Sequence, residues 1–124
     1  MSGHRAPTMP RDETMLSQAD FDELVAAFRS TGFAGANAWY MNDAANLAFA
    51  SEAPNFGRLT LPVLFLHAAR DAVSETLHSR LADPMREDCA DLHEVTIDGG
   101  HELTLEKPGD VNRAIEEWLS ARFL

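Results

Sequence analysis

The sequence predicts an α/β fold built around a parallel sheet, because two short segments have the patterns of strands. Residues 61–66 are continuously apolar, as in a strand that is covered on both faces, and Pro62 fits the start of that strand. Residues 91–97 form the second predicted strand, with Val95 and Ile97 on one face. A helix is expected between these strands and another after them, which is the βαβα order of a parallel sheet.

A sheet of two strands is too small to cover a strand as apolar as residues 61–66 on both sides. We therefore expect the chain to be the later part of a larger α/β domain.

Two helices are predicted before the strands. The first is capped by Ser17, with Asp20 three residues further on in an acidic variant of the capping box, and it ends at Gly32. The second covers residues 36–50. A loop with Pro54 and Gly57 leads on to the first strand.

Two further helices are predicted in the second half of the chain. A polar loop over residues 68–75 leads to a short helix over residues 76–82, and the last helix begins at Pro108, since proline is tolerated in the first turn. The apolar stripe of that last helix consists of Val111, Ile115, Trp118 and Leu119. An acidic run before the second strand is interpreted as a solvated loop: Asp83, Glu87, Asp88 and Asp91.

Composition and charge narrow the class of protein. The 124 residues suit one small domain or part of a larger one, and the hydrophobic content of 45% is that of a globular protein. The net charge of −10 argues against binding to nucleic acids or anionic membranes. The single Cys89 excludes an internal disulfide and a zinc site with several cysteines. We expect a soluble, cytoplasmic protein without a signal peptide.

Two polar residues follow the two predicted strands, at the edge of a parallel sheet where sites form: Asp71 and His101. An aspartate that bonds one imidazole nitrogen fixes the tautomer and stabilises the imidazolium, so that the histidine can act as a general base. The glycines before His101 allow a sharp turn that presents its ring. Taken singly, the aspartate could equally be a turn former and the histidine a solvated loop residue.

No metal or cofactor is expected. No two of the histidines form a close pair of ligands at metal-binding spacing: His67, His78, His93 and His101. His67 and His93 fit structural roles in the strands. Cys89 lies among carboxylates, which oppose formation of a thiolate.

Three local patterns resemble the C-terminal part of an α/β-hydrolase, most of all the epoxide hydrolase branch. Residues 32–40, GFAGANAWY, resemble the stretch of the helical cap in which a Trp-Tyr pair precedes the return to the core. Residues 61–66, followed by ARDAV at 69–73, resemble the strand and loop that carry the family's acid. DGGH at 98–101, with EKP at 106–108, resembles the histidine loop and last helix.

The resemblance covers residues 16–124 and implies a domain plan. Residues 1–15 are expected to be a disordered tail, residues 16–57 the C-terminal part of a helical cap, and residues 58–124 the C-terminal part of the core, with the N-terminal half of the fold absent.

The resemblance also implies roles for four residues. Asp71 would orient His101, which would activate the water that hydrolyses a covalent alkyl-enzyme ester. Tyr40 would donate a hydrogen bond or proton to the opening epoxide oxygen, and Trp39 would contact the substrate. Packing within a helix is the alternative interpretation of Trp39 and Tyr40.

Some features depart from the family pattern. No G-x-S-x-G elbow or equivalent nucleophile occurs in the chain, so we expect the chain alone to be inactive. Glu102 stands after His101 where the family often has an aromatic residue, and a carboxylate there is expected to raise the pKa of the histidine. Met41 follows the Trp-Tyr pair where the family often has arginine.

Two alternatives stay open at this point. One is another α/β-hydrolase, such as a haloalkane dehalogenase, an esterase or a lactonase, because the Asp71 and His101 loops fit those equally. If a complete site exists, the expected substrate is a small apolar epoxide or ester. The other is a non-catalytic fragment or pseudoenzyme that acts as a binding piece or as a homo-oligomer whose subunits cover exposed strand edges.

Overall fold

The structure is a computed structural model that describes residues 10–124. His4 and most of the tail predicted at residues 1–15 lie outside the described residues. The chain divides into two compact units, Met1–Met41 and Asn42–Leu124, which are described separately below. The predicted border between cap and core, after residue 57, remains a prediction.

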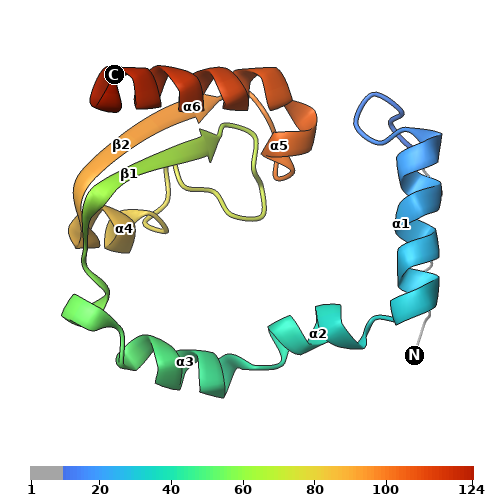
Figure 1. The fold of residues 1–124 in the computed structure, drawn as a ribbon, viewed down its shortest axis with the longest axis horizontal. Helices are drawn as coiled ribbons and strands as arrows, with labels where there is room; N and C mark the ends of the chain where they lie inside the picture. The colour runs from blue at the N-terminus through green and yellow to red at the C-terminus, as the bar shows by residue number, and fades with distance from the viewer. Residues whose placement is uncertain (1–9) are drawn as a thin grey trace. The chain divides into compact units, whose positions relative to one another are not determined.

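The first unit contains helices α1 (Gln18–Thr31) and α2 (Ala34–Tyr40) (Figure 1). The predicted cap of α1 is confirmed, because the Ser17 hydroxyl oxygen accepts a hydrogen bond from the backbone N–H of Asp20 at 3.2 Å. The predicted end is confirmed as well: Gly32 has a φ of 68° and donates its N–H to the carbonyl of Phe28 at 2.8 Å.

The helix predicted over residues 36–50 is wrong, since two helices occupy this stretch. The helix α2 ends at Tyr40, and α3 (Asp43–Ser51) begins after a break at Met41 and Asn42. Asn42 has a φ of −109° and a ψ of 22°. Its side chain makes no capping hydrogen bond and donates instead to Asn46 Oδ1 at 3.3 Å, and the low helix propensity of asparagine favours a break here. Trp39 and Tyr40 therefore lie in the last turn of α2, and not near the start of a longer helix.

The second unit contains α3, the short 3₁₀ helix η1 (Pro54–Gly57) and a parallel sheet of β1 (Leu59–Ala68) and β2 (Cys89–Ile97) in the described part of the chain. The predicted parallel pairing is confirmed, with Ala68 opposite Ile97 in the register. The strand β1 starts before Pro62, contrary to the prediction that proline begins it. The register is irregular between Leu59 and Pro62, which fits a residue without an N–H to donate.

The short helix predicted over residues 76–82 is also wrong. Within the described residues this stretch is a series of turns, and the helix α4 (Asp83–Asp88) follows where a solvated loop was expected. The Glu75 carboxylate accepts hydrogen bonds from the backbone N–H groups of Leu77, His78 and Ser79 at 2.6–2.8 Å. These amides are thereby held in a turn, and a helix begins only where a proline stands in its first turn.

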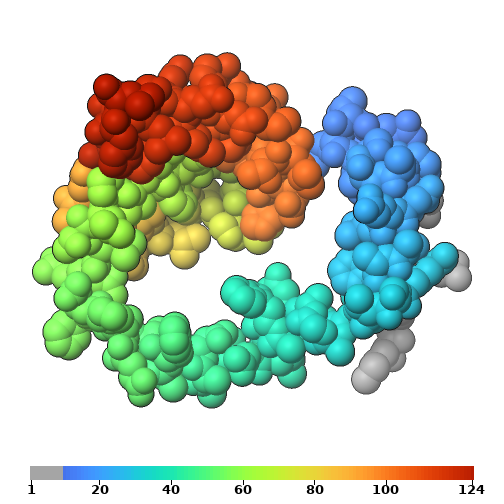
Figure 2. Space-filling view, viewed as in Figure 1, coloured from blue at the N-terminus to red at the C-terminus, as the bar shows by residue number. Residues whose placement is uncertain are grey.

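Helices α5 (Leu103–Glu106) and α6 (Pro108–Phe123) follow β2, and α6 starts at Pro108 as predicted. The helix α6 lies along one face of the sheet, and its atoms pack directly against it (Figures 1 and 2). The buried cluster there consists of Ile97, Val111 and Ala114, flanked by Leu66, Val95 and Leu103.

The expectation that residues 61–66 are covered on both faces is not met within the described chain, because Leu61 is exposed and the others are only half-buried. Large apolar side chains are exposed in both units, among them Leu47, Phe49 and Phe56. In residues 10–124 we find no helix with both the length and the apolar composition needed to cross a bilayer.

Replacing Val111 tests the core beneath α6. Val111→Ala is expected to lower the free energy of unfolding by about 2 kcal/mol, since it removes buried methyl groups and leaves a cavity. Val73→Ala is the matched control, because the Val73 side chain is 75% exposed, and it is expected to change stability by less than about 0.5 kcal/mol. Urea unfolding of both variants measures the difference, and equal effects would contradict the assignment of the core.

Candidate active site

The loops that follow β1 and β2 are joined by backbone hydrogen bonds that extend the parallel pairing. The N–H of Ala69 donates to the carbonyl of Ile97, and that of Arg70 donates to the carbonyl of Gly99, each at 2.9 Å. Residues just past the two strand ends are thus held at a common edge of the sheet, where sites form in parallel sheets.

Asp71 and His101 meet at this edge. Asp71 Oδ2 lies 3.0 Å from His101 Nδ1, while Asp71 Oδ1 accepts hydrogen bonds from the backbone N–H groups of Val73 at 2.8 Å and Ser74 at 2.9 Å. The aspartate side chain is 10% exposed and the histidine side chain is 50% exposed. The structure therefore brings together the two residues that the sequence placed after the strands, and it leaves the imidazole ring open to solvent.

The surroundings shift the pKa values of both groups. The pKa of Asp71 lies below its usual range because Ser74 donates a backbone hydrogen bond and His101 bonds the other oxygen. The pKa of His101 is raised, chiefly by the hydrogen bond and charge of Asp71, and to a smaller extent by the charge of Glu102. The charge of Glu102 thus raises the pKa of His101, as predicted.

These two shifts define a pH window for the pair. A carboxylate with a lowered pKa stabilises the fold above its ordinary pKa and loses that effect as the pH falls. A histidine with a raised pKa stabilises the fold below its ordinary pKa, and that effect is lost as the pH rises through the raised value. Both contributions are complete between about pH 4 and pH 6.5, the ordinary values of the two groups.

The two glycines before His101 allow close approach of side chains from the following turn. Neither has a positive φ angle, so glycine is required here because there is no room for a Cβ atom and not because of the backbone conformation. A Cβ atom on Gly100 would lie 2.6 Å from Oε1 of Glu106, and one on Gly99 would lie 2.6 Å from Cδ1 of Leu103. The N–H of Gly100 donates to Glu106 Oε2 at 2.7 Å, which ties the histidine loop to the end of α5.

Trp39 and Tyr40 belong to the first unit, whereas Asp71 and His101 belong to the second. Trp39 is 76% exposed and Tyr40 is 79% exposed. In the described residues they are therefore not buried by packing, which was the alternative interpretation of the pair, and their role toward a substrate remains a proposal.

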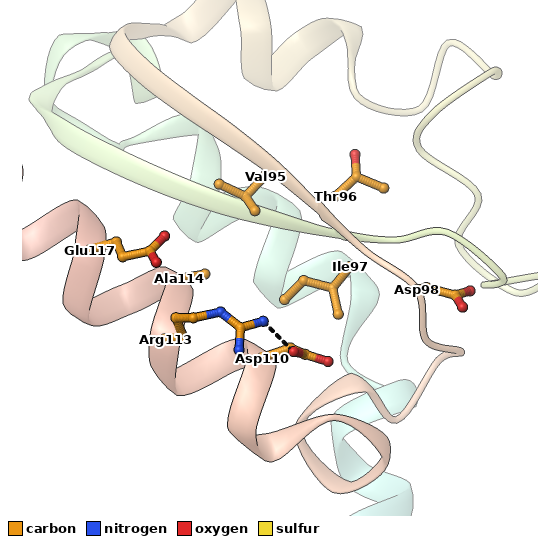
Figure 3. A pocket seen from close by; sticks show the side chains of 8 residues that line it. All are labelled: Val95, Thr96, Ile97, Asp98, Asp110, Arg113, Ala114 and Glu117. Atoms are coloured by element: carbon orange, nitrogen blue, oxygen red, sulfur yellow. Dashed lines mark hydrogen bonds and ion pairs between the residues drawn. The ribbon is translucent and has the colours of Figure 1, made fainter.

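A hollow lies between β2 and α6 (Figure 3), and neither Asp71 nor His101 lines it. It is lined by Val95, Ile97 and Ala114 at its base and has an Asp110–Arg113 ion pair at its rim. Across residues 10–124, no three His, Cys, Asp or Glu side chains come together in a way that could hold a metal ion.

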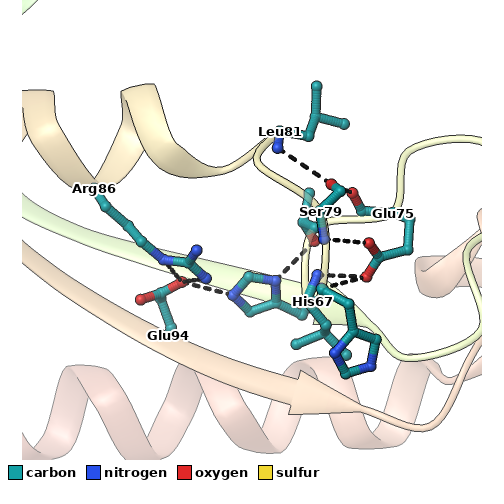
Figure 4. A network of polar contacts seen from close by, with 9 residues as sticks. His67, Glu75, Ser79, Leu81, Arg86 and Glu94 are labelled. Atoms are coloured by element: carbon teal, nitrogen blue, oxygen red, sulfur yellow. Dashed lines mark hydrogen bonds and ion pairs between the residues drawn. The ribbon is translucent and has the colours of Figure 1, made fainter.

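A second polar network surrounds His67. The sequence predicted only a structural role for this residue. Its Nδ1 lies 2.7 Å from the Thr76 hydroxyl and its Nε2 lies 2.8 Å from Glu94 Oε1. Arg86 of α4 donates to the same oxygen through Nε at 2.9 Å and Nη2 at 2.7 Å (Figure 4). The only signal in the sequence is a histidine near the end of an apolar strand, which does not reveal partners up to 27 residues away.

The amino-acid sequence of this chain is similar to those of several epoxide hydrolases. The chain is 34% identical over 108 residues to epoxide hydrolase A of Mycobacterium tuberculosis, an alignment that covers 85% of this chain and 32% of that protein. It is 28% identical to bifunctional epoxide hydrolase 2 of Sus scrofa and to that of Rattus norvegicus, over 91% of this chain and 20% of each relative. The chain thus spans a third or less of the curated relatives it matches.

No family model and no solved structure matches the chain. The similarity to epoxide hydrolases agrees with the resemblance found in the local motifs, and the parallel sheet with its helices agrees with an α/β fold.

Removing the Asp71 charge tests the electrostatics of the pair. Asp71→Asn is expected to lower the pKa of His101 toward its ordinary value of about 6.5, because the hydrogen-bonded carboxylate is the main cause of the shift. Glu102→Gln removes a neighbouring charge without a hydrogen bond to the ring and is expected to lower the pKa less. Imidazole NMR titration measures both, and a larger effect of Glu102→Gln would contradict this order of causes.

Because an added Cβ atom would contact Glu106 at Gly100 but nothing within 4 Å at Gly109, replacing each glycine with alanine is expected to change stability in opposite directions. Gly100→Ala is expected to destabilise the chain by about 1 kcal/mol, since the new methyl group displaces the carboxylate that accepts the Gly100 N–H. Gly109→Ala in the first turn of α6 meets nothing within 4 Å, and it is expected to stabilise by about 0.5 kcal/mol. Thermal unfolding compares them, and two changes of the same sign would argue against the contact.

Proposed function

We propose that this chain supplies the acid and the base of an epoxide hydrolase-like α/β-hydrolase that converts a small apolar epoxide into a diol. The observation that carries the proposal is the 3.0 Å hydrogen bond between Asp71 and His101 at the shared edge of the two strands. Similarity to three epoxide hydrolases supports the choice of reaction.

In this proposal His101 acts in the second half of the reaction. Asp71 accepts a hydrogen bond from the protonated Nδ1 of the ring, so the lone pair of Nε2 is free to take a proton from water. The water oxygen attacks the carbonyl carbon of an alkyl-enzyme ester, the ester C–O bond breaks, and the diol leaves with the proton that His101 returns. The neutral ring is the active form, so the raised pKa of His101 moves the onset of this step to higher pH.

Tyr40 acts in the first half of the reaction in this proposal. Its phenol donates a hydrogen bond or proton to the epoxide oxygen as a carboxylate opens the ring, and Trp39 contacts the apolar part of the substrate. Asp71 is already the hydrogen-bond partner of His101, and the sequence has no nucleophile elbow, so no residue of this chain is assigned as the attacking carboxylate in this proposal. The isolated chain is accordingly proposed to be inactive.

A second candidate is a non-catalytic binding piece. Its support is the exposure of large apolar side chains such as Phe49, Phe56 and Leu61, together with the open edges of a two-stranded sheet in the described residues. A haloalkane dehalogenase, esterase or lactonase is the further alternative within the hydrolases, since Asp71 and His101 suit each of them equally.

A chimera tests the proposed reaction. In epoxide hydrolase A of M. tuberculosis, the matched 108-residue segment is replaced by the corresponding residues of this chain. Folding is verified by a cooperative melt, and diol formation from styrene oxide is measured. We expect turnover by the chimera that falls by about 10⁴-fold or more in His101→Gln, and no turnover by the 124-residue chain.

A folded chimera without turnover would contradict the proposal and favour the binding piece. Tyr40→Phe in the chimera separates the hydrolases, because it is expected to slow epoxide opening more than hydrolysis of a simple ester such as 4-nitrophenyl acetate. Equal slowing of both reactions would argue for an esterase or lactonase.

A further inference from the structure

His67 is the most deeply buried polar residue of the described chain and has no part in the reaction proposed above. Its side chain is 2% exposed, and the ring of Phe65 meets it edge-on with the centroids 4.8 Å apart. Glu94, held by Arg86, accepts a hydrogen bond from Nε2, because a carboxylate has no proton to donate at neutral pH. The Nδ1 atom therefore faces the Thr76 hydroxyl with its orientation already fixed.

Thr76 lies in the same loop as Asp71, five residues further along. The start of this loop is joined to the loop after β2 through the N–H groups of Ala69 and Arg70. Between residues 72 and 82, the bond from Thr76 to His67 is the one hydrogen bond to the sheet among the described residues. The middle of the loop is thus hydrogen-bonded to the sheet through a single hydroxyl, while its end is fixed by the buried Ala82 and by α4.

The position of the Asp71 carboxylate depends on this attachment. Its Oδ1 accepts hydrogen bonds from the N–H groups of Val73 and Ser74, which lie three and two residues before Thr76, respectively. Glu75 stiffens the other side of Thr76, because its carboxylate accepts three backbone N–H groups from residues 77–79. A displacement of Thr76 is therefore passed on to the turn that holds Asp71 against His101.

We propose that His67 is a positioning residue, which anchors the acid-bearing loop through the hydroxyl of Thr76 and so keeps Asp71 in hydrogen-bond contact with His101. His67 does not touch the substrate in this arrangement. A hydroxyl can donate to a neutral ring nitrogen or accept from a protonated one, so the anchor holds in either charge state of the ring. The importance of the anchor for catalysis rests on the function proposed above, but its existence does not.

The pKa of His101 reports on the anchor without any need for turnover. In the full 124-residue chain, the imidazole signals are titrated by NMR and His101 is assigned with His101→Gln. Thr76→Val keeps the shape of the side chain and removes the hydroxyl, and it is expected to lower the pKa of His101 by about half a unit or more as Asp71 moves away. Thr76→Ser keeps the hydroxyl and is expected to retain the pKa of the unsubstituted chain.

Thr60→Val is the matched control at the exposed start of β1, and it is expected to leave the pKa of His101 unchanged. Hydrogen exchange gives a second measurement, because the amides of Val73 and Ser74 are expected to exchange faster in Thr76→Val while those of β2 do not. If Thr76→Val does not fold, His67→Gln is measured in the same way, since it keeps a donor for Glu94 and withdraws the acceptor from Thr76.

The outcomes separate the two proposals. An ordinary pKa of His101 in the unsubstituted chain would contradict the Asp71–His101 pair and with it the proposed function. A raised pKa that Thr76→Val leaves unchanged, with unchanged exchange of the Val73 and Ser74 amides, would overturn only the positioning role of His67.

Discussion

The continuation of parallel pairing beyond the ends of β1 and β2 is the constraint on which the second unit depends. The bonds from Ala69 to Ile97 and from Arg70 to Gly99 involve only backbone atoms, so they fix the two loops before any side chain contributes. Asp71 then follows the last bond of one loop directly, and His101 follows two residues after the last bond of the other. The 3.0 Å contact between the two side chains is a consequence of this register.

Two histidines of this unit have opposite surroundings, and this difference agrees with the different roles proposed for them. The His101 side chain is half exposed and is bonded through Nδ1, and among the described residues no hydrogen bond engages its Nε2. His67 is buried and bonded through both nitrogens. An imidazole that must exchange protons needs one free nitrogen in contact with solvent, whereas one that anchors a loop needs both nitrogens engaged. These surroundings suit the base proposed for His101 and the loop anchor proposed for His67.

Features that depend on local periodicity or on topology could be predicted from the sequence. The parallel strands, the caps at Ser17 and Gly32, and the meeting of Asp71 with His101 follow from patterns within a few residues or from the edge rule for parallel sheets. The break at Met41 and Asn42 was missed because the apolar residues continue on both sides of it. The turn around Glu75 was missed because the Glu75 carboxylate accepts backbone N–H groups, which a sequence pattern does not reveal. The His67 network was beyond prediction, since it joins residues from four separate segments.

The loops of the second unit are held mainly by polar contacts, because the apolar core of this unit is small. Ile97, Val111 and Ala114 are buried between β2 and α6. The loop after β1 is instead held in its turns by the Asp71 and Glu75 carboxylates, which accept backbone N–H groups of the same loop, and it is bonded to the sheet through the Thr76 hydroxyl. Such hydrogen bonds are directional and short in reach, whereas apolar contacts tolerate small displacements. Exposed ion pairs, such as that between Arg80 and Asp83, add little to this. The geometry of the Asp71–His101 pair is therefore governed by the hydrogen bonds of its loop more than by the packing of the sheet beneath it.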